Sequence, residues 1–247
     1  MLSRLIVSDN ILTTDPYFNN VSLLLRGNGS NGNQSFIDLS NFKNTLTANG
    51  NVQNVTTVRK NGVGSIYFDG SGDYLTIPAA PHLDFRETAF TIEAWIYPLP
   101  LVHGDGGCIL TNRPMWGGGA YNVQIYFGLT NDYNPPWYRL YFGMGDGNTY
   151  LCSFWTPNAI PLYSWSHVCV VIDLSYVRLY VNGVLENSRA WNNVILKSSY
   201  NQSTCHIGYG AYNSQYFSGY IDDLRVTKGI ARYTSNNFIP PTTPFPY

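Results

Sequence analysis

The chain has 247 residues, of which 44% are hydrophobic, so it can bury one self-sufficient core and is not a disordered chain. Only 12% of the residues are charged, and the formal net charge is −1. Without clustered Lys and Arg, the composition argues against nucleic acid or an anionic membrane surface as a partner.

Residues 1–20 predict an N-terminal arm that precedes the folded core. Their apolar runs are short and are interrupted by Ser8, Asp9 and Asn10. They are too short for a signal peptide, and no run in the chain reaches the ~18 apolar residues of a membrane span. We expect the arm to attach the protein to its neighbours through apolar side chains, namely Leu5, Ile6, Val7, Ile11 and Leu12.

Short strands dominate the sequence after the arm. Residues 65–68 and 73–77 flank an Asp-Gly-Ser-Gly turn, which predicts a β-hairpin. Residues 90–97 alternate in polarity, which places Glu93 and Trp95 on one face of a strand. Further strands are predicted at residues 122–129, 137–143 and 149–154.

The clearest strand unit lies at residues 166–185. Residues 173–175 join its two β-rich runs, and the Asn182-Gly183 pair that follows is a strong signal for a second tight turn. The last strand is predicted at residues 219–227, and short helical turns are plausible only at residues 81–85 and 229–233. Turn signals about every ten residues predict an antiparallel β-sandwich over residues 21–247.

The C-terminal residues 234–247 form a Pro-rich tail of this sandwich. Proline has no backbone N–H group, so the tail cannot pair as a central strand. We expect it to run extended over the surface of the sandwich or onto a partner.

The four cysteines favour burial as free thiols. They are Cys108, Cys152, Cys169 and Cys205, and no CxxC pair that would favour a zinc site is present. Three of them lie in apolar strand-like runs, where a thiol packs as a small hydrophobic group. A disulfide such as Cys152 with Cys169 is the alternative.

Catalysis finds little support in the sequence. Glycoside hydrolysis needs two carboxyl groups on one scissile bond, and Glu93 has no second acid two or four residues away. We interpret Glu93 as a hydrogen-bonded structural acid. None of the four histidines lies in a recognisable nucleophile or zinc motif.

Aromatic residues in loops are the candidates for contact with a glycan or a protein partner. An aromatic ring can stack on a sugar face, and an exposed aromatic cluster marks a protein interface equally well. The candidates in Gly-, Pro- or Asn-rich segments are Trp116, Tyr121, Tyr133, Trp137, Tyr209, Tyr212 and Tyr216.

The adjacent acids Asp222 and Asp223 lie in the last predicted strand. Strict alternation puts Tyr220, Asp222 and Leu224 on one face, so one of the two acids faces apolar groups. A buried carboxylate needs backbone N–H groups, an arginine or a metal ion as a partner.

Seven segments, in order, resemble the laminin-G-like, concanavalin A-like lectin/glucanase family. The resemblance covers roughly residues 21–245 and implies an antiparallel jelly-roll sandwich. Its segments are VSLLLRGNGSNG from residue 21, FIDLS from 36, SIYFDGSGDYLTIP from 65, FTIEAWIYP from 90, WSHVCVV from 165, VRLYVNGV from 177 and GYIDDLRVT from 219.

The resemblance also bears on metal binding. Some members of the family hold a structural Ca²⁺ near the first acid of the closing motif, here Asp222. Hard oxygen ligands suit this ion, and the candidate set is Asp222, Asp38, Asp69, Gly70 and Asp73. The alternative is that turn amides of the hairpin at residues 69–73 bind the Asp222 carboxylate without a metal.

The closing segment, from IDDLRVTKG to PFP, is similar to the end of such domains in tailed-bacteriophage virion proteins. This similarity implies a non-catalytic structural or adhesion protein on the virion surface, such as a fibre or capsid decoration. Its expected partners are other virion proteins, further copies of itself (a trimer among the options) and host surface glycans. The competing hypotheses are a free lectin-like module and, ranked below it, a glycan hydrolase.

Overall fold

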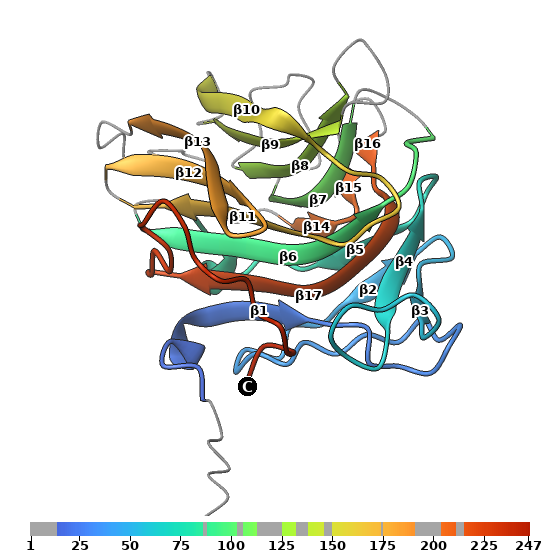
Figure 1. Ribbon diagram of the computed structural model, residues 1–247. Coiled ribbons are helices and arrows are strands. Elements are labelled where there is room, and N and C mark those ends of the chain that lie inside the picture. Colours follow the sequence, from blue (N-terminus) through green and yellow to red (C-terminus); the bar gives the residue numbers. More distant parts are fainter. Residues whose placement is uncertain are drawn as a thin grey trace, which may run out of the picture.

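The computed structural model describes residues 14–85, 88–102, 106–112, 125–131, 138–145, 150–173, 175–190, 204–210 and 215–247. It is an antiparallel β-sandwich, so the predicted fold class is confirmed (Figure 1). Two short 3-10 turns, η1 (Phe18–Asn20) and η2 (Pro81–Leu83), are the helical elements of the described residues. None of the described helices could cross a membrane.

Sheet A is the eight-stranded layer of the sandwich. Its strands follow the order β13-β12-β11-β6-β17-β4-β3, and β1 also pairs with β17, next to the part of β17 that pairs with β4. They are β1 (Val21–Leu25), β3 (Gln53–Val55), β4 (Ser65–Asp69), β6 (Phe90–Pro98), β11 (Ser166–Ile172), β12 (Tyr176–Val181), β13 (Val184–Ala190) and β17 (Ser218–Lys228).

Sheet B is the seven-stranded layer, in the order β10-β9-β8-β7-β14-β5-β2. A separate two-stranded ribbon, β15-β16, follows β14 in the chain. The strands are β2 (Thr47–Asn49), β5 (Tyr74–Ile77), β7 (Gly106–Asn112), β8 (Ile125–Asn131), β9 (Tyr138–Gly145), β10 (Tyr150–Ile160), β14 (Cys205–Ile207), β15 (Tyr209–Gly210) and β16 (Gln215–Tyr216).

The core lies between the two sheets and follows the two-residue period of the strands. In β6, Ile92, Ala94 and Ile96 point into it and are fully buried. The opposite face of β6, with Glu93 and Trp95, is buried as well. Something must therefore cover the outer face of sheet A.

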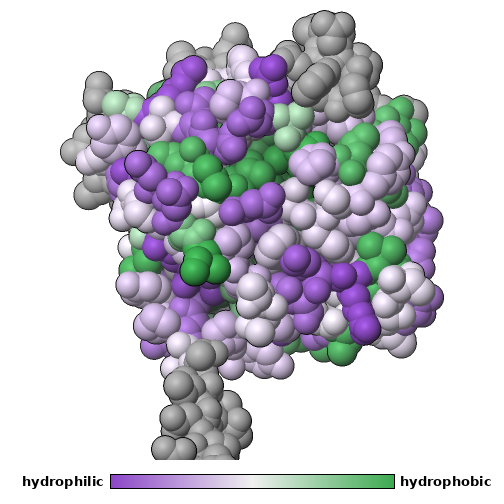
Figure 2. All heavy atoms as spheres, in the orientation of Figure 1, coloured by the Kyte–Doolittle hydropathy of each residue, from purple (hydrophilic) through white to green (hydrophobic). Residues whose placement is uncertain are grey.

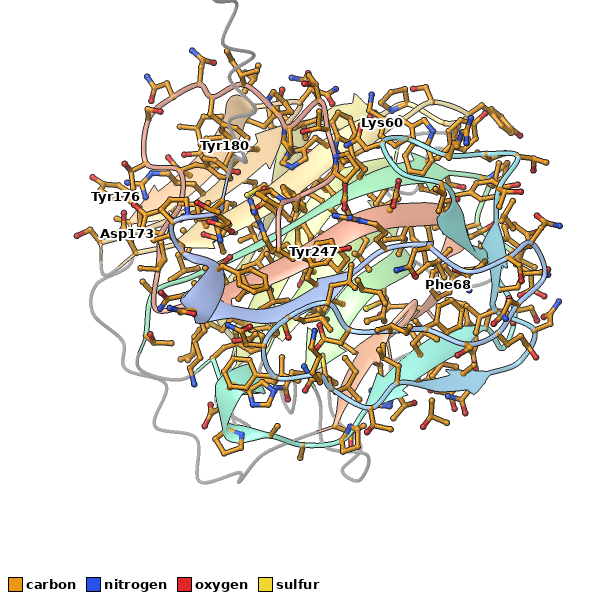
Figure 3. The ribbon with its side chains drawn as sticks, turned by 90° about the horizontal axis from the view of Figure 1, so that it is seen from below. Lys60, Phe68, Asp173, Tyr176, Tyr180 and Tyr247 are labelled. Atoms are coloured by element: carbon orange, nitrogen blue, oxygen red, sulfur yellow. The ribbon has the colours of Figure 1, made fainter. Side chains whose placement is uncertain are left out.

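The C-terminal tail provides much of this cover. Phe238 stacks on Tyr233 at 3.7 Å and contacts Tyr180 of β12. Further on, the ring of the buried Phe245 lies 3.6 Å from the guanidinium of Arg225. Figure 3 shows this segment passing over the Tyr180 end of sheet A and ending at Tyr247 over β17.

The turn at Asn182-Gly183 is confirmed and also holds the tail. Both residues have positive φ, of 50° and 79°, as the predicted hairpin turn requires. Phe238 donates its N–H to the carbonyl of Gly183 at 2.8 Å. A Cβ atom on Gly183 would overlap the carbonyl oxygen of Phe238, so only glycine fits.

The predicted hairpin at residues 65–77 is wrong. β4 pairs with β17 and β3 in sheet A, whereas β5 pairs with β14 and β2 in sheet B. The turn carries the chain from one sheet to the other. Its closure is local, because Asp69 donates its N–H to the Asp73 carboxylate. Turn chemistry therefore predicted the reversal correctly but could not specify the strand partners.

The strict alternation predicted for the last strand is also wrong. The pairing of β17 with β6 shifts between Asp222 and Arg225, and Asp223 has a φ of 48°. This β-bulge adds one residue to β17. Consequently Ile221 and Leu224 both point into the core, although strict alternation would put them on opposite faces.

Other predicted features have mixed outcomes. All four cysteines are free and buried, in agreement with the first of the two readings. The predicted helical turn at residues 81–85 is present as η2, whereas residues 229–233 contain no helix. Residues 14–20 of the predicted arm pack against sheet A through Asp15, and residues 1–13 with all five apolar arm residues lie outside the described part.

Figure 2 shows the surface on the side of Figure 1. Hydrophobic residues form one band across its upper half, and most of the remaining surface is hydrophilic or intermediate. This pattern agrees with a chain in which uncharged polar and aromatic residues take the place of charged ones.

Candidate functional site

The outer face of sheet B gathers aromatic residues from strands far apart in the sequence. Strand alternation turns Tyr74 of β5, Tyr126 of β8, Tyr141 of β9 and His206 of β14 away from the core. Their neighbours along each strand are core residues, for example Leu75 beside Tyr74. The core therefore fixes the direction of these four rings.

Three tyrosines form a stacked group at one end of this face. Tyr209 and Tyr216 face each other across the β15-β16 ribbon, with ring centroids 4.8 Å apart and planes inclined by 25°. Tyr74 lies 5.0 Å from Tyr209, and His206 lies 5.8 Å from both Tyr74 and Tyr209. All three tyrosines are partly exposed. We call Tyr74, Tyr126, Tyr141, His206, Tyr209 and Tyr216 the sheet B cluster.

Tyr126 connects the stacked group to the middle of the sheet. Its ring lies under Gly210, where a Cβ atom would come within 2.7 Å of it. On its other side it meets Tyr141 edge-on at 5.5 Å, and the Tyr141 hydroxyl lies 3.0 Å from the Ser153 hydroxyl. Gly210 therefore lets the ribbon come close to the strands of sheet B.

Two polar atoms of the cluster are buried without a partner. Within the described part of the chain, neither the Tyr126 hydroxyl nor His206 Nδ1 has a hydrogen-bond partner. Burial raises the pKa of Tyr126 well above its usual range and lowers the pKa of His206. Tyr126 thus remains a hydroxyl donor and His206 a neutral imidazole at pH 7. Unsatisfied buried polar groups are costly and call for an explanation, and a bound ligand is one.

The cluster can therefore bind a ligand that has both apolar faces and hydroxyl groups. Its rings offer flat apolar surface, and its hydroxyl and imidazole groups offer hydrogen bonds. No charged group belongs to it.

Glu93 lies on the other sheet and is sealed from solvent. Its carboxylate accepts two hydrogen bonds from Arg225, at 2.8 and 3.0 Å, and one from the Tyr233 hydroxyl at 2.9 Å. His167 Nε2 lies 3.2 Å from the same carboxylate. Burial alone would raise the pKa of Glu93, but the charge of Arg225 and the close contact with His167 outweigh it and lower the pKa to about 2. The interpretation as a structural acid is confirmed.

Asp15 completes this ion network. Its carboxylate pairs with Arg232 at 2.6 Å and with Arg225 at 3.1 Å, and its side chain is 3% exposed. Burial alone would raise the pKa of Asp15, but the hydrogen bond from Arg232 contributes to a net lowering. One network therefore joins the N-terminal segment, β6, β17 and the segment just before the C-terminal tail. We call Asp15, Glu93, Arg225 and Arg232 the sheet A ion network.

The predicted calcium ligands do not come together in one site. Asp38 is saturated by Ser40, Asn44 and the N–H of Leu24. Among the described residues, no group of three His, Cys, Asp or Glu side chains is placed to hold a metal ion.

The remaining candidates divide between two places. Asp69 with Gly70 and Asp73 forms the turn between the sheets, where Asp73 accepts N–H groups from Asp69 and Asn51. Asp222 is four residues along β17 from Ser218, the residue opposite Asp69. That separation is about 13 Å of strand.

Asp222 is held without the turn amides expected for it. It accepts the N–H groups of Asn61 and Asp223, at 3.3 and 2.9 Å. Burial, and next the charge of Asp223, raises the pKa of Asp222 to about 6. Asp223 in turn pairs with Arg26 at 2.7 Å.

The structure brings together two of the seven predicted contact residues. Tyr209 and Tyr216 stack in the sheet B cluster, whereas Trp116, Tyr121, Tyr133, Trp137 and Tyr212 lie outside the described residues. Sequence reasoning missed Tyr74, Tyr126, Tyr141 and His206. The alternation of residues 74–77 and 138–145 marked outward positions, but only the topology shows that these positions are neighbours.

Comparison with known proteins now places the fold in a family. The sequence pattern described as the concanavalin A-like lectin/glucanases superfamily matches residues 69–230, well over half of the chain. The chain belongs to this superfamily. The resemblance in the sequence is thereby confirmed at the level of the family. A search of curated proteins finds no match.

Solved structures of the superfamily fold share little sequence with the chain. One is domain 4 of AbnA, an extracellular arabinanase of glycoside hydrolase family 43 from Geobacillus stearothermophilus, which was solved with arabinotriose. Its TM-score is 0.59 at 16% identity, and the match covers 85% of this chain and 93% of that domain's chain. The binding domain of Paraclostridial Mosquitocidal Protein 1 has a TM-score of 0.64 at 17% identity, covering 89% of this chain and 51% of its own.

A third similar structure comes from botulinum neurotoxin type C, whose cell entry is described as dependent on two ganglioside molecules. It has a TM-score of 0.59 at 13% identity and covers 89% of this chain and 50% of its own. The chain thus spans about half the length of these toxin domains. At such low identity the likeness concerns the fold.

Proposed function

We propose that this chain is a non-catalytic, lectin-like module that binds glycans through the sheet B cluster. The observation that carries the proposal is a pair of buried polar atoms without a partner among the described residues. They are His206 Nδ1, whose ring lies beside that of Tyr209, and Tyr126 Oη, whose ring lies under Gly210. A sugar can satisfy both needs, because its hydroxyl groups bond to the polar atoms while its C–H face packs on a ring.

The similar structures support the proposal at the level of binding. The arabinanase domain was solved with arabinotriose, and the neurotoxin is described with gangliosides. A non-catalytic role is favoured by Glu93, whose carboxylate is fully buried under the C-terminal tail and bonded to Arg225. A substrate could reach it only if the tail moved away.

The biological setting that we propose is the surface of a tailed-bacteriophage virion. There the chain would be a fibre, a decoration protein or another surface component, in contact with other virion proteins and with further copies of itself. The support is the similarity of the closing segment to virion proteins. Mass spectrometry of purified particles tests the setting, and absence of the chain from them would favour the free lectin-like module.

A glycan array with purified protein tests the binding proposal. Replacing Tyr209 or Tyr216 with Ala removes a stacking ring, which should cost about 1–3 kcal/mol and so lower affinity roughly 5- to 150-fold. Tyr176→Ala is the matched control, because Tyr176 is 44% exposed and lies on sheet A. Specific binding that both cluster variants retain at full strength would refute the assignment of the site.

A further inference from the structure

The outer face of sheet A carries a second row of aromatic rings, apart from the sheet B cluster. Tyr67 of β4, Tyr220 of β17 and Tyr97 of β6 are direct neighbours in the strand register. Trp165, the residue before β11, continues the row beside Tyr97. Ring centroids along the row are 5.0, 5.7 and 5.6 Å apart, and all four rings are partly exposed. We call these four residues the sheet A row.

The row is one exposed side chain wide, and most of the residues along its borders are polar. On the same face, Asp69 of β4 and Ser218 of β17 lie on one side of it, and Asp222 of β17 and the buried Trp95 of β6 lie on the other. At the β3 end the row meets Gln53, which pairs with Tyr67. With one ring on each of four adjacent strands, the row is about 15 Å long.

The hydroxyl groups of the row make no hydrogen bonds to the described residues. No hydrogen bond within the described part of the chain uses the hydroxyl groups of Tyr67, Tyr97 or Tyr220. Two residues before Tyr97 on the same face, the buried indole N–H of Trp95 also lacks a partner among the described residues. The ammonium of Lys60 lies over the Trp95 ring, 4.0 Å from its centre.

We infer that the sheet A row is a second binding surface, for an extended chain of a neutral polysaccharide. A linear series of rings with free hydroxyl groups matches a polymer that repeats an apolar C–H face and hydroxyl groups along its length. A protein partner fits less well, since stable protein interfaces bury roughly 800 Å² on each side around a broad apolar centre. A single file of exposed rings, with Asp69, Ser218 and Asp222 along its borders and Trp95 buried beside it, offers no such centre.

The row does not depend on the sheet B cluster, because the two lie on the outer faces of different sheets. The two binding surfaces can therefore be removed one at a time. Trp165→Ala and Tyr220→Ala remove rings of the row, and Tyr209→Ala with Tyr216→Ala removes the stacked pair of the cluster. Tyr220→Phe keeps the ring and removes only the hydroxyl group.

Affinity electrophoresis through native gels that contain arabinan, xylan or mixed-linkage β-glucan measures the binding. We expect the Tyr209→Ala/Tyr216→Ala variant to remain retarded by at least one polymer. Adding Trp165→Ala and Tyr220→Ala to it should reduce that retardation at least tenfold in apparent affinity. Tyr220→Phe should weaken binding less than Tyr220→Ala, and Tyr176→Ala should migrate as the wild type does.

Three results would overturn the inference. The first is that variants of the row migrate like their parent proteins in all three gels, whatever the cluster variants do. The second is that the wild type sediments as a dimer that Trp165→Ala dissociates, since the row would then be an interface between copies of the chain. Loss of all retardation on removal of the cluster alone would also contradict the row while leaving the proposed function intact.

Discussion

Replacing Glu93 with Gln tests whether the sheet A ion network stabilises the fold. Glu93 is fully buried and accepts three hydrogen bonds, two of them from Arg225. A glutamine keeps one oxygen acceptor but removes the negative charge opposite Arg225. Removing one partner of a buried ion pair costs about 3–5 kcal/mol, because the other charge stays buried.

The lowered pKa of Glu93 gives a second estimate of how much its charge stabilises the fold, and it also gives the pH dependence of that stabilisation. A shift from the ordinary value of 4.5 to about 2 corresponds to roughly 3 kcal/mol of stabilisation. For a carboxyl group whose pKa is lower in the folded state, this stabilisation is present above pH 4.5 and is lost as the pH falls toward 2. The difference between wild type and Glu93→Gln should therefore be constant near neutral pH and shrink in acid.

Urea unfolding followed by tryptophan fluorescence, at several pH values from 7 to 3, measures this difference. The matched control is Asp173→Asn, which removes the charge from the more exposed pair with Arg178 and should change stability by less than about 1 kcal/mol. A cost below about 1 kcal/mol for Glu93→Gln at pH 7, or the same cost at pH 7 and pH 3, would refute the reasoning.

Three further predictions concern the buried acid pair, the glycines and the thiols. Folding raises the pKa of Asp222 from 3.8 to about 6, so Asp222→Asn should stabilise the protein at pH 7 by up to roughly 3 kcal/mol. For the same reason, urea unfolding of the wild type should show stability rising as the pH falls from 7 to 4. Gly72 has a φ of 83° with open space around it, so thermal unfolding should show that Gly72→Ala costs about 1 kcal/mol. Gly183→Ala should cost at least about twice as much, because its Cβ atom overlaps Phe238 of the tail. Equal costs would contradict the role of the tail. A thiol reagent should label none of the four buried cysteines in the native protein and all of them after unfolding, and fast native labelling would contradict their burial.

The elements that the sequence predicted well are those that depend on local chemistry. The two-residue period placed Ile92, Ala94 and Ile96 in the core, and the Asn182-Gly183 pair predicted its turn, because side-chain direction and turn preference are set within a few residues. The same reasoning isolated Glu93 as an acid without a second carboxylate. It could not identify Arg225 as the partner of Glu93, because the two residues are 132 positions apart in the chain.

The failures arise where the pairing of distant strands decides the outcome. The turn at residues 69–73 looks like a hairpin turn, yet its two strands find their partners in different sheets. The same limit applies to the site. Tyr74 and Tyr209 are separated by more than half of the chain and meet only because β14 lies beside β5.

The β-bulge at Asp223 shows how one extra residue gives the outer face of sheet A two roles. Before the bulge, Tyr220 points outward into the sheet A row; after it, Arg225 points outward to Glu93. Positions five apart in a regular strand point to opposite faces, so the bulge lets both residues share one face while Leu224 stays in the core.

Deleting Asp223 therefore tests whether the bulge is required. Without this extra residue, Tyr220 and Arg225 are four positions apart, so regular pairing keeps both on the outer face and Leu224 in the core. We therefore expect the deletion variant to fold, with the loss of the ion pair between Asp223 and Arg26 as its main cost. Asp223→Asn is the matched variant, because Asn tolerates the φ of 48° and loses only the charge that pairs with Arg26. It should fold as well, and the difference between the unfolding free energies of the two variants gives the contribution of the bulge apart from that of the ion pair. An insoluble or unfolded deletion variant, with Asp223→Asn folded, would contradict this reasoning, because it would show that β17 needs the extra residue for more than the direction of Tyr220 and Arg225.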